Sequence, residues 1–177
     1  MQEALLAIGQ KFSDTIANPD GLLAWIKTVI LGGFENHKIG ASDMPAIQVI
    51  YRGSQIEARE VGCTKMRATF DIHLVYNASS FTGESPLRYD KTKRIDTSML
   101  ISDQVEKRAN CEYDATSICG IILANQNLHL VEAGQDDVLI WHGWQIDSIV
   151  YGTFQRGAWN TYPTWEAIVS TTLFYKI

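Results

Sequence analysis

The sequence predicts an α+β fold in which a mostly antiparallel β-sheet is packed by helices on one side. The first residues repeat apolar side chains at helical spacing, whereas Met66 to Tyr76 alternates apolar and polar side chains at the period of a strand. Two apolar segments near the C-terminus also have strand length. Because helices and strands do not alternate strictly, an antiparallel sheet is favoured over a parallel one. The 177 residues suit a single domain, 1–177.

The N-terminal region predicts a pair of helices over about residues 2–31. The apolar residues Leu5, Ile8, Phe12 and Ile16 fall on one helical face over residues 2–17. Asn18 and Pro19 then form a suitable N-cap and first turn for a second helix through Leu31. Gly32 and Gly33 follow, and glycine commonly ends a helix.

The strands are predicted from alternation and from turn residues. A short strand opens at Pro45 and runs through Tyr51, and residues 52–54 read as a turn. In the long strand that follows, Met66, Phe70, Ile72 and Leu74 are expected to be buried, and Lys65, Arg67 and Asp71 to face solvent or a ring lumen. Further strands are predicted over Val138–Tyr151, apolar on both faces, and over Trp165–Ile177.

Between these strands lie a long arm and two helical segments. The arm, residues 78–95, is longer than a compact domain needs, and such connections are usually functional or disordered. Its basic residues Arg88, Lys91, Lys93 and Arg94 are either part of a solvated loop or a contact for an acidic partner surface or nucleic acid, although Glu84 and Asp90 weaken the nucleic-acid reading. Residues 96–110 are predicted to be helical, and Asp114 is predicted to cap a second helix containing Ile118, Ile121 and Ile122.

Composition excludes several classes of protein. The net charge of −5 and the pI near 5.3 give no general attraction to nucleic acid. Cys63, Cys111 and Cys119 lack metal-ligand spacing, so buried or idle thiols are expected and neither a metal site nor a disulfide framework is predicted. The N-terminus does not resemble a signal peptide, and the apolar stretch at residues 22–31 is too short to span a bilayer. We therefore expect a protein made in a cytosol, without a membrane contact.

No motif in the sequence indicates a catalytic activity. Phosphate-binding loops, dinucleotide fingerprints and nucleophile elbows are absent, so we expect no enzyme, no catalytic residues and no cofactor. His73 and Asp71 share the polar face of the long strand, but such pairs are common on exposed strands. The aromatic residues around Trp159 and Tyr162 are interpreted as core and interface. Trp141 and Trp144 are expected on opposite faces of their strand.

The order of these elements resembles the tail terminator proteins of long-tailed bacteriophages. A helical N-terminus leads to a strand after Pro45-Ala46-Ile47, a long alternating strand precedes an extended loop, and a central helix follows. The literal match lies in the closing strand pair, Ile146 to Gly152 and Trp165 to Leu173. This chain is longer than the smaller terminators in the second N-terminal helix and in the arm. The family contributes no catalytic residues.

The resemblance implies a structural virion protein that forms a hexameric ring. Such a ring caps the tail tube at the head-proximal end, stops its growth and presents a surface for the head. Its partners would be other copies of the chain, the tail tube protein and a neck or head-completion protein, while DNA passes through the lumen without sequence-specific binding. The candidate interface residues are Arg88, Lys91, Lys93, Arg94, Trp159 and Tyr162. Two alternatives stay open: a neck or head-completion protein, and a monomeric ligand-binding or hydrolytic domain that uses the aromatic C-terminal region.

Overall fold

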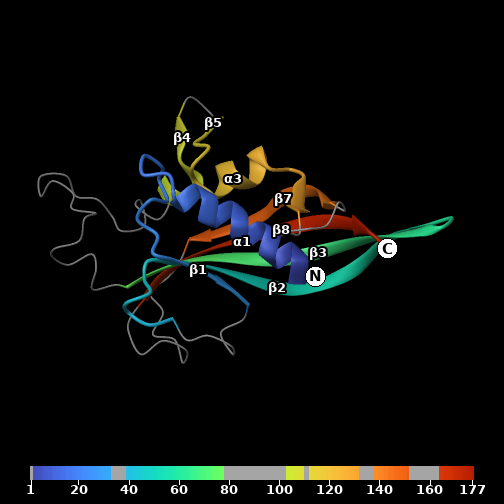
Figure 1. The fold of residues 1–177 in the computed structure, drawn as a ribbon, viewed down its shortest axis with the longest axis horizontal. Helices are drawn as coiled ribbons and strands as arrows, with labels where there is room; N and C mark the ends of the chain where they lie inside the picture. The colour runs from blue at the N-terminus through green and yellow to red at the C-terminus, as the bar shows by residue number, and fades with distance from the viewer. Residues whose placement is uncertain (1, 33–38, 78–102, 110–111, 132–137, 152–163) are drawn as a thin grey trace, which may run out of the picture.

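The chain folds around one curled, mostly antiparallel sheet, which confirms the predicted α+β class (Figure 1). The computed structural model describes residues 2–32, 39–77, 103–109, 112–131, 138–151 and 164–177. Within them the elements are α1 (Gln2–Ile16), β1 (Thr28–Leu31), β2 (Ala46–Glu60), β3 (Cys63–Asn77), β4 (Arg108–Ala109), β5 (Glu112–Tyr113), α3 (Ile118–Ala124), β6 (Leu128–Val131), β7 (Val138–Tyr151) and β8 (Thr164–Lys176).

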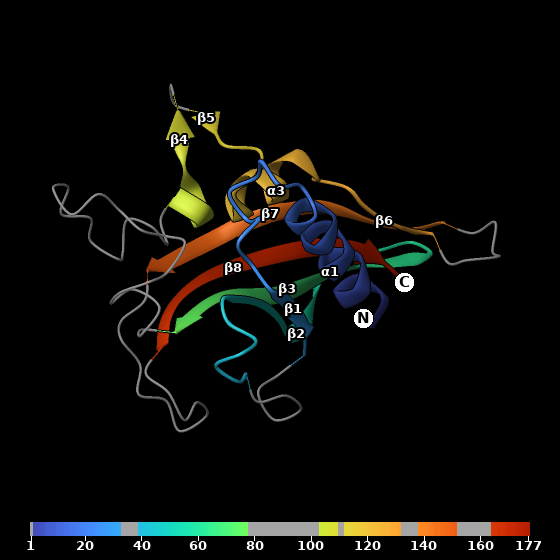
Figure 2. The same cartoon turned by 60° about the vertical axis from the view of Figure 1, so that its left-hand side comes forward.

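The main sheet has six strands in the order β1-β2-β3-β8-β7-β6. Strand β1 pairs with β2 in parallel, and every other neighbouring pair is antiparallel. Figure 2 shows β3, β8 and β7 bending together along their length. The last strand, β8, therefore lies in the centre of the sheet. Because β6 pairs only with Val138 to Trp141, the rest of β7 forms the edge of the described sheet on that side.

Helix α1 follows the predicted periodicity closely. Ala4, Ala7, Ile8 and Phe12 are buried against the sheet, while Leu6 and Gln10 face outward. At Gly9 the helix passes so close to β1 that a Cβ atom there would lie 2.7 Å from Cδ2 of Leu31. This contact sets the approach of α1 to the sheet margin.

The predicted second N-terminal helix is wrong. Asn18 forms a turn instead, with its side chain accepting the N–H of Asp20 at 3.2 Å, and the chain continues in turns to Lys27. Thr28 to Leu31 then pair in parallel with Ala46 to Val49. The segment holds three consecutive β-branched residues, which prefer strands, and pairing with a distant segment overrides the local helical spacing.

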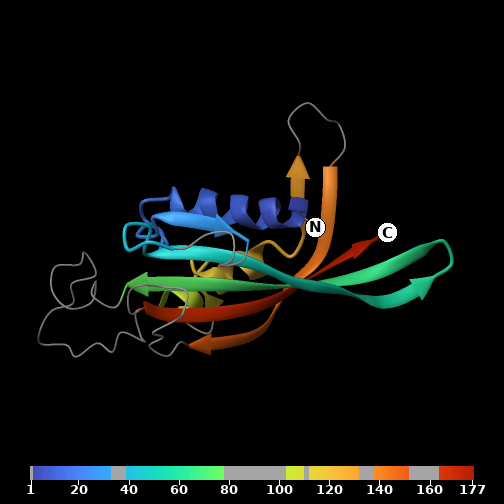
Figure 3. The same ribbon diagram turned by 90° about the horizontal axis from the view of Figure 1, so that it is seen from below.

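The predicted turn at residues 52–54 is also wrong. Strand β2 runs on to Glu60 through a register irregularity between Tyr51 and Gly53, where Gly53 has a φ of +141°. The reversal occurs at Val61 and Gly62, which has a φ of +88°. β2 and β3 thus form one long hairpin, and Figure 3 shows its far end projecting beyond the rest of the sheet.

Strand β3 shows the predicted alternation on its core side. Ala68, Phe70, Ile72, Leu74 and Tyr76 are buried, whereas Met66 near the projecting end is only half-buried. On the opposite face Lys65 and Arg67 are half-exposed, whereas the Asp71 side chain, expected to face solvent or a lumen, is only 14% exposed because Arg52 and Ser170 bond it. His73 and Val75 on this second face are nevertheless buried, because Ile30, Ile39, Met44 and Ala46 form a small second cluster with Val75.

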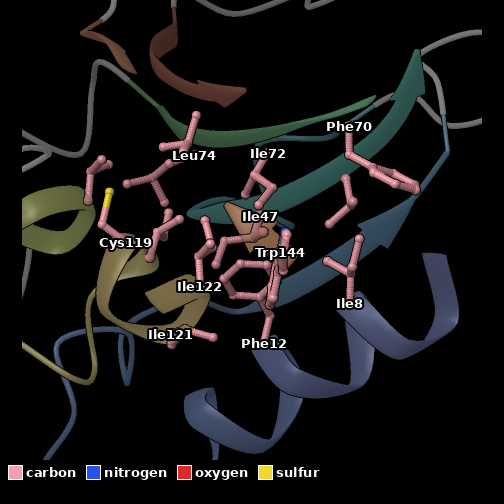
Figure 4. Packing of buried hydrophobic residues seen from close by; sticks show 14 of the residues in the cluster. Ile8, Phe12, Ile47, Phe70, Ile72, Leu74, Cys119, Ile121, Ile122 and Trp144 are labelled. Atoms are coloured by element: carbon pink, nitrogen blue, oxygen red, sulfur yellow. The ribbon is translucent and has the colours of Figure 1, made fainter. Parts of the chain in front are cut away.

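The main core brings together buried residues of α1, α3 and the sheet. Figure 4 shows Ile8 and Phe12 of α1 and Ile122 of α3 converging on Ile72 and Leu74 of β3. At its centre the rings of Phe12 and Trp144 meet edge to face with centroids 6.3 Å apart. Trp144 is almost completely buried, so this contact anchors α1 to β7.

Trp141 and Trp144 do not lie on opposite faces, as simple alternation predicts, but in the same core. Between them the register against β8 shifts, since His142 faces Phe174 and Gln145 faces Thr172. β7 therefore contains one residue more than β8 over this stretch, with Gly143 at a φ of +63°. A bulge of this kind changes the parity of the strand and turns both indoles inward.

The remaining elements match the prediction in part. Strands β7 and β8 lie within one residue of their predicted bounds. Of the predicted helix at 96–110, residues 103–106 are helical and Arg108 and Ala109 belong to β4, while residues 96–102 and 110 lie outside the described part. The cap of α3 is Ser117 rather than Asp114: Ser117 Oγ accepts the N–H of Gly120 at 3.0 Å.

Candidate functional site

The predicted interface residues fall outside the described part of the chain. Arg88, Lys91, Lys93 and Arg94, with the whole arm 78–95, lie within residues 78–102, and Trp159 and Tyr162 lie within residues 152–163. The structure therefore leaves their interface role a prediction. The candidate surfaces described below come from other residues.

The described surface exposes several large apolar side chains near the margins and the end of the sheet. Single exposed apolar residues are normal, but neighbouring ones indicate contact sites. The exposed residues are Leu6, Trp25, Leu31, Ile56, Val61, Leu123, Val150, Tyr151 and Ile177. Of these, Leu31 lies on β1, Val150 and Tyr151 end β7, and Ile56, Val61 and Ile177 lie at the projecting end of the sheet.

The far end of the β2–β3 hairpin is the first candidate surface. Val61 at its turn is fully exposed, and Ile56 is 52% exposed. Ile56, Met66 and Tyr175 face one another across three strands on the side that carries the core, beyond the buried residues. The hydroxyl groups of Tyr51 and Tyr175 both meet Ser54 Oγ, at 2.6 and 3.2 Å, which holds the base of the hairpin.

The sheet face opposite the main core forms the second candidate surface, and its charges are paired. Arg52 Nε lies 2.6 Å from Asp71 Oδ2, and Ser170 Oγ donates to Asp71 Oδ1 at 2.7 Å. Arg67 lies 3.5 Å from Asp147. Because Arg52 and Arg67 each have an acidic neighbour, the part of the face around these two residues carries little net charge, whereas Lys65 on the same face packs over the Phe174 ring. A neutral polar face has no strong attraction for either a polyanion or a polycation.

His73 takes part in a buried pair on this same face, but not with Asp71. Its Nδ1 bonds the Glu166 carboxylate, and both residues are buried. Gln48, which faces His73 on β2, is fully buried and donates through Nε2 to the Gly32 carbonyl at 2.8 Å. The separation of 93 positions between the partners explains why the sequence does not reveal this pair.

Of the three thiols expected to be buried or idle, Cys119 is buried as expected, and Cys111 lies outside the described residues. Cys119 is buried in the main core beside Ile118 and Ile122, and burial raises its pKa to about 12, so the reactive thiolate is suppressed near neutral pH. Cys63 is half-buried at the hairpin. No group of three His, Cys, Asp or Glu side chains within the described ranges could hold a metal ion.

Neither the models of known protein families nor the curated proteins contain a match to the chain. None of the described helices is long and apolar enough to cross a bilayer. The candidate contact surfaces of the described residues are the projecting hairpin, the charge-paired sheet face, and the sheet margins at β1 and β7.

Proposed function

We propose that this protein is a tail terminator of a long-tailed bacteriophage: a structural protein of the virion, not an enzyme. Copies of the chain would form a ring, most simply a hexamer, that caps the tail tube at its head-proximal end and ends its polymerisation. The other face of the ring would receive a neck or head-completion protein. The protein would be made in the host cytoplasm, and DNA would pass through the lumen without sequence-specific binding.

The observation that carries the proposal is the pairing of the two segments on which the resemblance rests. Ile146 to Tyr151 and Ala167 to Thr171 are adjacent antiparallel strands, with Tyr151 opposite Ala167 and Ile149 opposite Val169. A curled antiparallel sheet supports the same reading at the level of fold. In this proposal α1 and α3 cover one side of the sheet, and the arm 78–95 with its basic residues contacts a neighbour.

The exposed apolar residues give the proposal a physical motive. Val61, Ile56 and Val150 lie at the ends and margins of the sheet, where one small core does not reach them. Identical partners usually cover such surfaces by rotation into a closed assembly. The charge-paired sheet face suits a lumen, because paired charges do not hold a passing polyanion.

The decisive experiment is electron microscopy of tails assembled with and without this protein. We expect tubes of uniform length that join heads when the protein is present, and overlong tubes without heads when it is absent. Uniform tubes that join heads in its absence would remove the proposal. Overgrown tubes are not expected if the protein is a neck or head-completion protein, because tube length would then be normal and only head joining would fail.

A further inference from the structure

The same rows of paired residues across the sheet end at strand β1 on one side and at the last residues of β7 on the other. These two strand edges are called the margins of the sheet. Three rows run from one margin to the other, each through five paired strands: Val29-Ile47-Leu74-Ala167-Tyr151, Ile30-Gln48-His73-Ile168-Val150 and Leu31-Val49-Ile72-Val169-Ile149. Among the described residues, each of these rows therefore ends at β1 on one side and at β7 on the other.

Among the described residues, each of these margins has a strand neighbour on one side only. β1 pairs with β2, and β6 covers β7 only between Val138 and Trp141. Just beyond Trp141 the Trp144 N–H still donates to the Gln126 carbonyl at 2.9 Å, and from Gln145 to Val150 the described strand that pairs with β7 is β8. A strand margin of this kind presents a row of backbone N–H and C=O groups that can pair with a further strand.

Features that normally block such pairing are present nearby but absent from these margins. Bulges, charges and proline on a margin prevent association between sheets. β7 has register shifts between His142 and Ser148 and carries Asp147, and β2 has two register shifts beyond the end of β1. In contrast, Thr28–Leu31 and Ser148–Val150 keep a regular register and contain no charge and no proline.

The side chains at the two margins are also complementary. Val150 is 56% exposed at one end of its row, whereas Ile30 at the other end is buried with Ile39 and Met44. A neighbouring copy would place Val150 beside that cluster and extend it. On the core side, Ile149 would meet Leu31, which is 37% exposed and packs against Gly9 of α1.

The strand directions permit this contact between copies that are arranged head to tail. β1 is parallel to β2, and the antiparallel pairs β2-β3, β3-β8 and β8-β7 make β7 run opposite to β1. A second copy that continues the sheet therefore presents its β7 antiparallel to β1. We propose that copies of this chain join head to tail by pairing β1 of one copy with residues 148–150 of β7 in the next. The inference deepens the proposed function and rests on it for the closure of the chain of copies into a ring.

Disulfide trapping between two variants tests the contact. Leu31→Cys and Ile149→Cys are prepared separately, with Cys63 and Cys111 replaced by Ser, and mixed under mild oxidation. Opposite residues of antiparallel strands have Cα atoms about 4.5–5.5 Å apart, within the range of a disulfide. Within one copy the two positions lie about four strand spacings apart, roughly 19 Å, too far for a bond. We expect the disulfide only in the mixture.

A mixture of Val29→Cys with Ile149→Cys tests the register shifted by two residues, which keeps the side chains on the same faces. The absence of a mixed disulfide in both mixtures at millimolar protein would overturn the proposal. A disulfide dimer in each variant alone would also overturn it, because it indicates a two-fold contact instead of a head-to-tail one.

A charge at the margin provides a second test by sedimentation velocity. Val150→Lys should weaken self-association at least tenfold, since the charge would lie against the apolar cluster of the next copy. Leu123→Lys, on an exposed apolar residue of α3, is the matched control and should not change it. Equal association of the two variants refutes the margin contact. If both tests refute the margin contact but tails are still capped in the presence of the protein, only the margin contact is overturned and the terminator proposal stands. The two proposals can therefore fail separately.

Discussion

Gly143 should be one of the least replaceable residues of β7, and its substitution by alanine tests the bulge directly. Its φ of +63° lies in the left-handed region, which disfavours any side chain. In addition, a Cβ atom built at this position would lie 2.9 Å from Cδ2 and 3.5 Å from Cε2 of the Phe174 ring. Gly143→Ala therefore combines a backbone cost with a contact that Phe174 must relieve.

The size of the loss follows from these two parts. A left-handed conformation costs a non-glycine residue about 1–2 kcal/mol. Moving the Phe174 ring off its preferred rotamer costs about 0.5–1.5 kcal/mol, and it disturbs the packing of the Lys65 ammonium group 4.7 Å from the ring centre. Gly143→Ala should therefore lower the free energy of unfolding by about 2–3 kcal/mol.

Urea unfolding followed by tryptophan fluorescence is a suitable assay, because Trp141 and Trp144 flank the substituted residue in the core. Gly62→Ala is the matched control. Gly62 has a φ of +88° but no atom within 4 Å of an added Cβ, so only the backbone part applies. The Gly143→Ala loss should also shrink by the contact part in a Phe174→Ala background.

Two results would refute this reasoning. If Gly143→Ala costs no more than Gly62→Ala, the Phe174 contact is not real. If the loss is the same with and without the Phe174 ring, the bulge does not hold Gly143 against β8, and the inward position of both indoles needs another cause.

Three further predictions follow from the buried residues. Phe70→Ala should cost about 3–5 kcal/mol, since Phe70 is fully buried and its ring packs 5.4 Å from that of Tyr51. Glu166→Ala should cost about 3–5 kcal/mol by leaving His73 buried without its carboxylate, whereas replacing both residues by leucine should cost much less. Iodoacetamide should label Cys119 only on unfolding, and stability should fall as the pH rises from 9.0 toward 12, where the unfolded thiol ionises and the folded one does not.

Each of these predictions has a control. Lys65→Ala should cost no more than about 1 kcal/mol, because its ammonium group only packs on the Phe174 ring. If Phe70→Ala and Lys65→Ala lower the free energy of unfolding equally, the assigned register of β3 is wrong. Additive losses for the His73 and Glu166 single variants would show that the pair does not act together. Cys119→Ala should remove part of the alkaline loss of stability, whereas Cys63→Ala should not. Rapid labelling of Cys119 in the folded protein would contradict its burial.

The sequence predicted best where local pattern and tertiary packing agree. In β3 the period of two places Phe70, Ile72 and Leu74 on one face, and all three are buried. The second N-terminal helix failed because spacing alone cannot distinguish a short buried strand from a helix. Thr28 to Leu31 become a strand by pairing with Ala46 to Val49, a partner that no local pattern announces.

The candidate surfaces were predictable only in part. Glycine residues were the available signal for the strand irregularities that the sequence analysis missed. A glycine inside a strand pattern often marks a bulge, so Gly53 and Gly143 offered evidence of the two irregularities that alternation alone missed. No comparable signal existed for the contact of His73 with Glu166, because sheet order decides which distant residues become neighbours.

The bulge at Gly143 also changes where a partner would have to bind. A strand apolar on both faces suggested that a neighbour covers much of β7. The bulge instead brings Trp141 and Trp144 into the same core, which satisfies that part of the strand within one copy. The exposed large apolar residues of β7, Val150 and Tyr151, lie past the bulges. The exposed apolar surface of β7 that favours self-association is thus confined to a short, regular and uncharged strand margin. Backbone pairing with another copy is chemically possible there.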